Sequence, residues 1–334
     1  MPDDRTTVTE LATALGTVGP ADLATVLEKR PPVVKINDDD WDRIEALHDS
    51  RRFAAEFAAA FANGQAFLTA RNALRGRCPI EVEWIGGRRS IGDEATPTDI
   101  RIDHVFQISC KYLSSNIANV SPARLFDGLL STAGNWQRRD WYETTAPAEY
   151  RELYAVCRNA SGLKELPVNH GDLTTAHRRL ISKSIRGRKY PENAQRAYAQ
   201  LCEAVSIASA DRWNTNIKRA GMGERMLWRL LRIGGASYYL LGVDASQLLR
   251  VRVAGPGDWR QEFEFVSLDI TAARAGQPQV NWIGRCRERS SHKTREVRGR
   301  AEIRWSHGRF RQPPEAKIYV ETPVSELPGY FALT

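Results

Sequence analysis

The sequence has no apolar run that approaches the roughly 20 residues needed by a membrane-spanning helix. Its first ten residues, MPDDRTTVTE, lack the basic and then apolar order of a signal peptide, so we expect a cytoplasmic protein. The five cysteines are scattered without a CxxC spacing, and an odd number cannot all pair within one chain. We therefore expect reduced thiols. The six histidines form no HExxH motif or paired Cys/His arrangement, which argues against a structural zinc site.

Positive charge is what the chain has in excess. Its 48 Lys and Arg residues against 40 Asp and Glu give a net charge of +8 and a pI near 9.3. Lys and Arg attract phosphates and gain from counterion release, so this composition favours a polyanionic partner. A basic protein that only needs solubility is the alternative. The hydrophobic share of 42% and the charged share of 26% are ordinary for a folded protein.

Helical periodicity dominates the first part of the chain. Residues 6–30 predict two short amphipathic helices around GTVGPAD, with either Asp22 or the Gly-Pro pair marking the second start. Residues 39–74 predict further helix, because large apolar side chains recur at i+3 and i+4, with an interruption at Asn63-Gly64. The N-terminal helices are either a docking element for a protein partner or a packing appendage.

Strand-like segments follow. IEVEWIGG (residues 80–87) predicts one strand, and TPTDIRIDHVFQISCKYLS (residues 96–114) contains two more short β-rich runs. Ser121 as N-cap and Pro122 at the first helical position then predict a helix start. The predicted order is helix, strand, strand, strand, helix.

In the rest of the chain, the sequence pattern changes at Gly234. Before it the pattern is mostly helical, and after it short β-like runs are separated by Gly and Pro. We therefore predict four parts. They are a small helical unit (1–36), a core that contains the three strands (37–140), a helical region (141–234) and a β-rich basic domain (235–334).

The stretch of residues 96–114 places an Asp, a Ser-Cys-Lys triplet and a turn-like Asp-His pair close together. Antiparallel pairing of its two runs brings Asp99 near Ser109 and Lys111, which alternation puts on one face of the hairpin. A two-residue turn would put Asp99 on the opposite face. The arrangement therefore requires a three-residue or bulged connection, in which Asp99 lies opposite Ser109 and Asp103 belongs to the turn.

Such a hairpin has the parts that phosphodiester hydrolysis requires. A divalent cation held by carboxylate and carbonyl oxygens polarises the phosphoryl group and lowers the pKa of an attacking water. A nearby Lys orients that water and offsets charge in the transition state. The alternative is a half-buried hairpin in which Asp99 caps a turn and Lys111 reaches into solvent.

The run PTDI (residues 97–100), followed by an apolar strand that ends in ISCK (residues 108–111), resembles the PD-(D/E)XK nuclease superfamily. Within it, the pattern is similar to members that carry Ser where others carry an acidic residue. The resemblance covers about residues 60–130. It implies a restriction-endonuclease-like α/β fold, with a mixed sheet flanked by helices, and cleavage that depends on Mg²⁺ or Mn²⁺. The segment 37–140 is then a nuclease-like core.

The resemblance also implies roles for individual residues. Asp99 matches the metal ligand, Lys111 the catalytic lysine, and the Cys110 carbonyl a backbone metal ligand. Ser109 matches the second acidic residue by position. A hydroxyl binds Mg²⁺ less well than a carboxylate, so Ser109 leaves open whether the site is active.

Two further catalytic candidates lie before the hairpin. Members of the superfamily often carry a Glu on the helix before the first strand, where this chain has Gln65, with Glu56 a few turns earlier. Glu81 and Glu83 share one face of the strand predicted at residues 80–87, and we favour Glu83 as a metal ligand.

Two basic tracts are candidates for DNA contact. Residues 285–311 hold ten Lys or Arg against three Glu, with Trp305 and Phe310 interleaved, so that Arg can bind phosphates and aromatics can stack on bases. The alternative is a solvated strand face. Residues 177–191 form the second tract. The predicted nucleic-acid-binding residues are Arg298, Arg300, Arg304 and Arg309 in the first tract, and Arg186 and Lys189 in the second.

Together these patterns predict a metal-dependent DNA endonuclease, with restriction, phage defence or repair as the roles that the resemblance implies. A non-catalytic DNA-binding or adaptor subunit with the same fold is the alternative. We expect DNA as the partner and no membrane association. A homodimer is left open.

Overall fold

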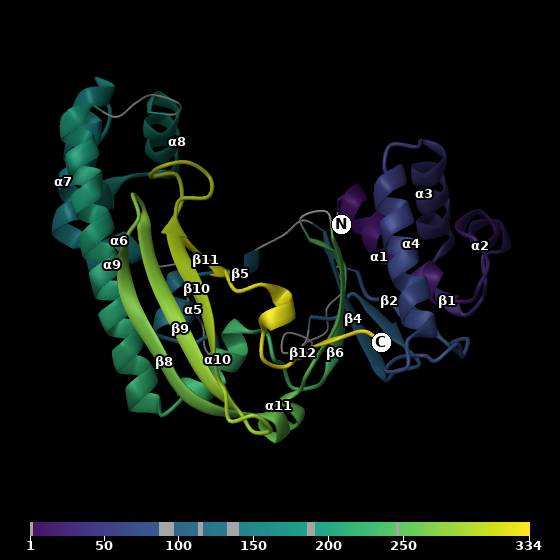
Figure 1. The fold of residues 1–334 in the computed structure, drawn as a ribbon. Coiled ribbons are helices and arrows are strands. Elements are labelled where there is room, and N and C mark those ends of the chain that lie inside the picture. The colour runs from purple at the N-terminus through teal and green to yellow at the C-terminus, as the bar shows by residue number, and fades with distance from the viewer. Residues whose placement is uncertain (1–2, 87–96, 113–115, 132–139, 186–190, 245–246) are drawn as a thin grey trace.

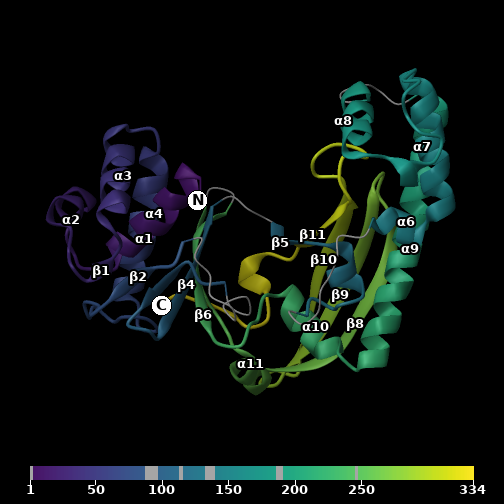
Figure 2. The ribbon, with the colours of Figure 1, turned by 180° about the vertical axis from the view of Figure 1, so that it is seen from behind.

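The computed structural model describes residues 3–86, 97–112, 116–131, 140–185, 191–244 and 247–334. The buried apolar side chains of these residues form two clusters. One joins side chains up to Ile108 with Tyr239 and Leu241, and the other joins side chains from Leu125 onward. Figures 1 and 2 show the two corresponding parts of the molecule, with the N-terminal helices in one and the long C-terminal strands in the other. The chain is a mixed α/β protein with two cores.

Two short helices open the chain, as the sequence predicted. They are α1 (Asp4–Gly16) and α2 (Leu23–Lys29). Asp3 caps α1 and Asp22 caps α2, and each carboxylate accepts a hydrogen bond from the amide three residues ahead, at 2.8 Å in both helices. These bonds satisfy amides that have no partner inside the helix.

The next helical stretch differs from the prediction. It consists of α3 (Asp38–Asp49) and α4 (Ala54–Thr69), so the predicted interruption at Asn63-Gly64 is wrong. Helix α4 continues through this pair because Gly64 lies against α1. A Cβ atom on Gly64 would come within 2.1 Å of the Thr13 carbonyl oxygen. The glycine is therefore needed for close helix packing rather than for a helix end.

The first sheet is mixed, with seven strands in the order β1-β2-β3-β4-β6-β7-β12. The pairs β1/β2 and β4/β6 are parallel and the other neighbours are antiparallel. Along β6, Tyr239 and Leu241 join the N-terminal cluster while Tyr238 joins the other. The sheet is therefore flanked by helices and lies between the two cores. Its strands are β1 (Val34–Lys35), β2 (Val82–Trp84), β3 (Ile100–Ile102), β4 (Phe106–Tyr112), β6 (Tyr238–Asp244), β7 (Gln247–Val253) and β12 (Tyr330–Ala332).

Strands β6, β7 and β12 come from the C-terminal region, which the sequence predicted to be β-rich without indicating strand partners. Gly242 of β6 lies beside Lys111 of β4, and a Cβ atom on this glycine would come within 1.9 Å of the Lys111 carbonyl oxygen. Asn63 donates to the Gly242 carbonyl at 3.0 Å and accepts from Arg250 of β7 at 2.8 Å. These contacts attach the C-terminal strands to helix α4.

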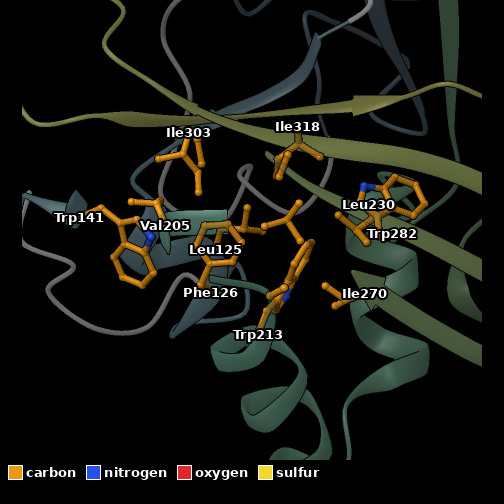
Figure 3. Close-up of a cluster of buried hydrophobic side chains, with 14 of the residues drawn as sticks. Leu125, Phe126, Trp141, Val205, Trp213, Leu230, Ile270, Trp282, Ile303 and Ile318 are labelled. Carbon is orange, nitrogen blue, oxygen red and sulfur yellow. The ribbon is translucent and has the colours of Figure 1, made fainter. Parts of the chain in front are cut away.

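The second sheet is antiparallel, with the order β5-β11-β10-β9-β8. Its strands are β5 (Asn116–Val120), β8 (Phe263–Arg274), β9 (Pro278–Glu288), β10 (Thr294–Arg304) and β11 (Glu315–Val320). One face packs on the long helix α9 (Glu192–Ala220). Figure 3 shows Trp282 and Ile303 of this sheet above Phe126 and Trp213 of the helices. The β-rich C-terminal region therefore contributes to both sheets.

The helices from α6 to α10, which lie between β5 and β6 in the sequence, agree with the predicted helical middle. Ser121 caps α5 and Pro122 is its first residue, as predicted. The helices are α5 (Pro122–Phe126), α6 (Trp141–Thr145), α7 (Pro147–Ser161), α8 (Thr175–Ser184), α9 and α10 (Gly223–Leu230), followed by α11 (Pro256–Glu262) between β7 and β8. In the part of the chain that the structure describes, no helix has both the length and the apolar character needed to cross a membrane.

Candidate functional site

The β3–β4 hairpin has the register that the sequence argument required. Ile100 lies opposite Ile108 and Ile102 opposite Phe106, so three residues form the connection. Asp103 and His104 adopt left-handed backbone conformations, with φ of 50° and 59°. Asn, Asp and His are the non-glycine residues most often found there. The prediction of a three-residue turn is confirmed, and Asp99 comes opposite Ser109.

Asp103 belongs to the turn, as predicted, and anchors it to the neighbouring strand. Its Oδ1 accepts from the amides of Ile80 at 2.7 Å and Glu81 at 2.9 Å, and its Oδ2 pairs with Arg77 Nη2 at 2.6 Å. Burial opposes ionisation, but these hydrogen bonds and the guanidinium hold the pKa of Asp103 below its ordinary value. Its charge therefore stabilises the corner of the sheet.

Asp99 is held by the strand opposite it. Its Oδ2 accepts from the Cys110 amide at 2.7 Å and from the Ser109 hydroxyl at 3.2 Å. Both side chains are buried, with 6% of Asp99 and 1% of Ser109 exposed. Ser109 thus donates a hydrogen bond to the carboxylate, which fixes the orientation of Asp99. The structure brings these two predicted site residues together.

Lys111 follows two residues later on β4, on the Ser109 face of the strand. The pKa of the Cys110 thiol shows which charged groups lie near it. Burial first, and then the carboxylates of Asp99 and Glu10, raise the pKa of this thiol well above its ordinary value, while a hydrogen bond to Thr13 and the Lys111 charge oppose the shift. Asp99, Glu10 and Lys111 are therefore close enough to Cys110 to interact electrostatically.

Glu10 is a buried carboxylate near Cys110 that sequence reasoning did not identify. It lies on α1, is only 6% exposed, and accepts a hydrogen bond from Trp84 Nε1 at 2.7 Å. In the sequence it reads as part of the polar face of an amphipathic helix. The available signal was weak, because nothing in the local pattern shows that α1 is buried along nearly its whole length.

Glu83 and Arg101 lie opposite each other on β2 and β3, and their side chains form an ion pair at 3.3 Å. Cross-strand register puts this pair on the Asp99 side of the sheet, whereas Trp84 and Ile100 face the helices. Diagonal neighbours in a sheet lie about 7–8 Å apart, so Glu83 is near Asp99 without direct contact. Its role as a metal ligand stays a prediction.

The other acidic and amide candidates have different partners. Glu81 lies 3.6 Å from His104, at the turn end of the hairpin. Gln65 Nε2 donates at 3.3 Å to the Ala21 carbonyl, in the segment between α1 and α2. Glu56 pairs with Arg5 at 3.2 Å. No described contact joins Gln65 to Asp99, and its catalytic role also stays a prediction.

The donors around Asp99 fit a magnesium ion only in part. Among the described residues, no three His, Cys, Asp or Glu side chains gather closely enough to form a metal site. Mg²⁺, however, keeps several waters and is commonly bound by one or two carboxylates together with substrate phosphates. Of the predicted oxygen ligands, Asp99 supplies one carboxylate, and the Cys110 carbonyl and Glu83 stay predictions.

The first basic tract lies on β9, β10 and the segment that follows them. Arg298, Arg300 and Arg304 alternate on the outer face of β10, where Arg298 pairs with Glu296 at 2.6 Å and Arg300 with Glu302 at 2.9 Å. Glu302 also lies 3.4 Å from Arg304. The predicted arginines are thus on one face, but each has an acidic partner.

The aromatic residues of this tract do not face solvent as base-stacking groups would. Phe310 is fully buried and stacks on Tyr150, with ring centroids 5.9 Å apart. Trp305 is half-buried and packs edge-on against Tyr142. Arg309 lies over the Tyr198 ring at 6.0 Å. The expectation of free aromatics was wrong, because these rings belong to the C-terminal core. The predicted Arg186 and Lys189 lie outside the described residues.

Comparison with known proteins adds no assignment: the chain matches no protein-family model, and neither a curated protein nor a solved structure is significantly similar to it.

Proposed function

We propose that this protein is a metal-dependent endonuclease that hydrolyses phosphodiester bonds in DNA, with a restriction-endonuclease-like core. The observation that supports the proposal most is the hairpin register, which sets Asp99 opposite Ser109 with Lys111 on the same strand face. The net charge of +8 agrees with a nucleic-acid substrate. A cytoplasmic role in restriction, phage defence or repair follows only from the resemblance.

Each residue has a distinct task in this proposal. Asp99, the Cys110 carbonyl and Glu83 hold Mg²⁺ or Mn²⁺, which supplies charge to polarise the phosphoryl group and to lower the pKa of a water. Lys111 orients the water and offsets the negative charge that develops on the phosphate. Ser109 keeps the Asp99 carboxylate in one orientation through the 3.2 Å hydrogen bond.

The test is cleavage of plasmid and single-stranded DNA with Mg²⁺, with Mn²⁺ and with EDTA. Asp99→Asn keeps an oxygen acceptor for the Cys110 amide but removes the charge, and Lys111→Met keeps the length of the side chain without the ammonium. We expect each to reduce cleavage by at least about 100-fold while DNA affinity in EDTA stays unchanged. Asp103→Asn is the control for a carboxylate outside the site and retains cleavage. Equal cleavage in all four proteins contradicts the proposal.

A non-catalytic DNA-binding or adaptor subunit is the second candidate. Two observations favour it. A hydroxyl stands at Ser109 where the resemblance has a carboxylate, and Asp99 is 6% exposed with its carboxylate bonded to a backbone amide. A carboxylate in such a position stabilises the hairpin without any metal. DNA binding by the wild type without cleavage under any metal condition selects this candidate.

A further inference from the structure

The two basic tracts, which are far apart in the sequence, meet in the structure. Arg178 Nη1 of α8 donates at 3.1 Å to the Phe310 carbonyl, in the segment between β10 and β11 (the β10–β11 loop, residues 305–314). Gly308 of this loop lies over Ser182 of α8, and a Cβ atom on the glycine would come within 2.5 Å of the Ser182 hydroxyl. Figures 1 and 2 both show the loop passing below α8 at one end of the molecule.

Both elements of this surface have a fixed conformation. Thr174 and His177 form a capping box that starts α8. In the loop, Gly308 and Phe310 adopt left-handed backbone conformations, with φ of 101° and 59°. Phe310 is fully buried against Trp305 and Tyr150, so the core holds the loop in this conformation. Side chains that project from the loop and from α8 therefore keep their relative places.

The exposed cations here differ from those of β10 in their partners. Arg179, Lys183 and Arg311 are exposed, and among the residues that the structure describes none of them has an acidic group within ion-pair distance. The exposed arginines of β9 and β10, by contrast, have acidic partners: Arg287, Arg295 and Arg298 pair with Glu264, Glu288 and Glu296. A phosphate that approached an arginine of β10 would have to displace its glutamate.

We infer that α8 and the β10–β11 loop form the surface that binds the phosphate backbone of duplex DNA. The inference rests on the proposed function and assigns its substrate contact to Arg179, Lys183 and Arg311 instead of the arginines of β10. Arg179 and Lys183 are four residues apart on α8 and share a helix face, with Cβ atoms about 5–6 Å apart. Phosphates of one DNA strand follow one another with a rise of about 3.4 Å along the helix axis, so these two long side chains on one helix face can each contact a phosphate of the same strand.

The experiment measures duplex affinity by fluorescence anisotropy in EDTA over a range of salt concentrations. The test variant is Arg179→Gln, Lys183→Gln and Arg311→Gln together. The matched control is Arg287→Gln, Arg295→Gln and Arg298→Gln, which removes the same charge from exposed but paired arginines. For each phosphate that the test variant no longer binds, we expect the salt slope to fall by about 0.9 and affinity at about 0.1 M salt to fall roughly eightfold.

We expect this weakening in the test variant and at most a third of it in the control. Equal weakening in both variants would show a response to net charge alone and overturn the inference, as would an unchanged test variant. Displacement of the duplex by polyglutamate as effectively as by unlabelled duplex would assign the surface to acidic proteins instead. No binding by the wild type contradicts both proposals, whereas the expected weakening in a protein that never cleaves contradicts only the nuclease.

Discussion

The two sheets each carry a polar face, and the two faces neutralise charge in different ways. On the first sheet, Asp99 is buried and accepts hydrogen bonds from a backbone amide and from the Ser109 hydroxyl. On the second sheet, Arg298 and Arg300 lie along β10 among glutamates that pair with them on the same strand. Neutral donors therefore orient the Asp99 carboxylate, whereas the arginines of β10 are balanced by glutamates.

This difference decides what each face can bind. A carboxylate that is oriented by neutral donors keeps its full charge for a cation or for the transition state of a reaction. Arginines that are paired with glutamates gain little from a phosphate, because an existing pair must first be broken. Strand alternation therefore shows which side chains share a face, but only the partners of those side chains show whether the face is available.

The largest predicted effect comes from a second negative charge on the Asp99 face of the first sheet. Ser109→Glu puts a second carboxyl beside Asp99 at a position that is 1% exposed. We expect the free energy of unfolding to fall by about 3 kcal/mol near neutral pH, because the two carboxylates repel each other in a buried place. The introduced carboxyl should have a raised pKa, so the destabilisation is present above that pKa and disappears as the pH falls below it. Chemical denaturation at several pH values measures it.

The effect of added Mg²⁺ on the stability of Ser109→Glu distinguishes a metal site from a hairpin with a purely structural role. If an ion binds between Asp99 and the introduced carboxylate, Mg²⁺ should recover most of the missing stability in Ser109→Glu. Ser306→Glu is the control, since Ser306 is exposed in the β10–β11 loop. The same Mg²⁺ response in both variants would argue against a metal site at Asp99.

The second prediction compares how much two arginines of β10, Arg298 and Arg300, contribute to stability. Glu302 is 8% exposed in its side chain and accepts from Arg300 at 2.9 Å, whereas Arg298 is 66% exposed. Arg300→Gln should cost about 2 kcal/mol of unfolding free energy, because it leaves a buried carboxylate with a weaker partner. Arg298→Gln should cost at most about 0.5 kcal/mol. Adding Glu302→Gln to Arg300→Gln should restore part of the stability, and thermal denaturation of the wild type and these three variants tests it.

Sequence reasoning predicted the local features and missed those that depend on contacts between residues far apart in the sequence. The β3–β4 turn was predictable because alternation and loop length restrict each other, and Asp103 was correctly assigned to it. Gly64 was taken for a helix breaker because its contact with α1 lies some fifty residues away in the chain. The pairing of β4 with β6 joins Lys111 to Gly242, a contact that no local pattern encodes.

The same limit applies to the candidate site. Asp99, Ser109 and Lys111 were found because they lie in one hairpin. The buried position of Glu10 depends on how α1 packs, and the acidic partners of Arg300 include Glu321, which follows β11 and lies outside the basic tract. The burial of Phe310 depends on Tyr150 in helix α7. Short motifs therefore predicted which residues lie close together better than they predicted exposure.

A third prediction concerns the corner of the first sheet, where the Asp103 carboxylate accepts hydrogen bonds from two backbone amides and pairs with the Arg77 guanidinium. Asp103→Asn should lower the unfolding free energy by about 1 kcal/mol at neutral pH, because the amide oxygen still accepts from the Ile80 and Glu81 amides but the amide nitrogen cannot pair with Arg77. The pKa of Asp103 is lowered in the folded protein, so its contribution is complete above the ordinary carboxyl pKa of about 3.9 and is lost as the pH falls through the folded value. The stability difference between wild type and variant should therefore narrow below about pH 4.

The last prediction concerns Ser109→Ala, which tests whether the hydroxyl orients Asp99 or binds the metal. The variant removes one hydrogen bond to Oδ2 but keeps the Cys110 amide bond at 2.7 Å, so we expect a decrease of about 1 kcal/mol in unfolding free energy. Cleavage should fall by less than about tenfold, with the Mg²⁺ concentration needed for half-maximal activity almost unchanged, because an orienting group changes geometry more than affinity. Ser109→Thr, which keeps the hydroxyl, should restore cleavage if its methyl group is accommodated. A large rise in the Mg²⁺ requirement of Ser109→Ala would instead identify the hydroxyl as a metal ligand, and the polar face of the first sheet would then bind its cation directly through Ser109 as well as through Asp99.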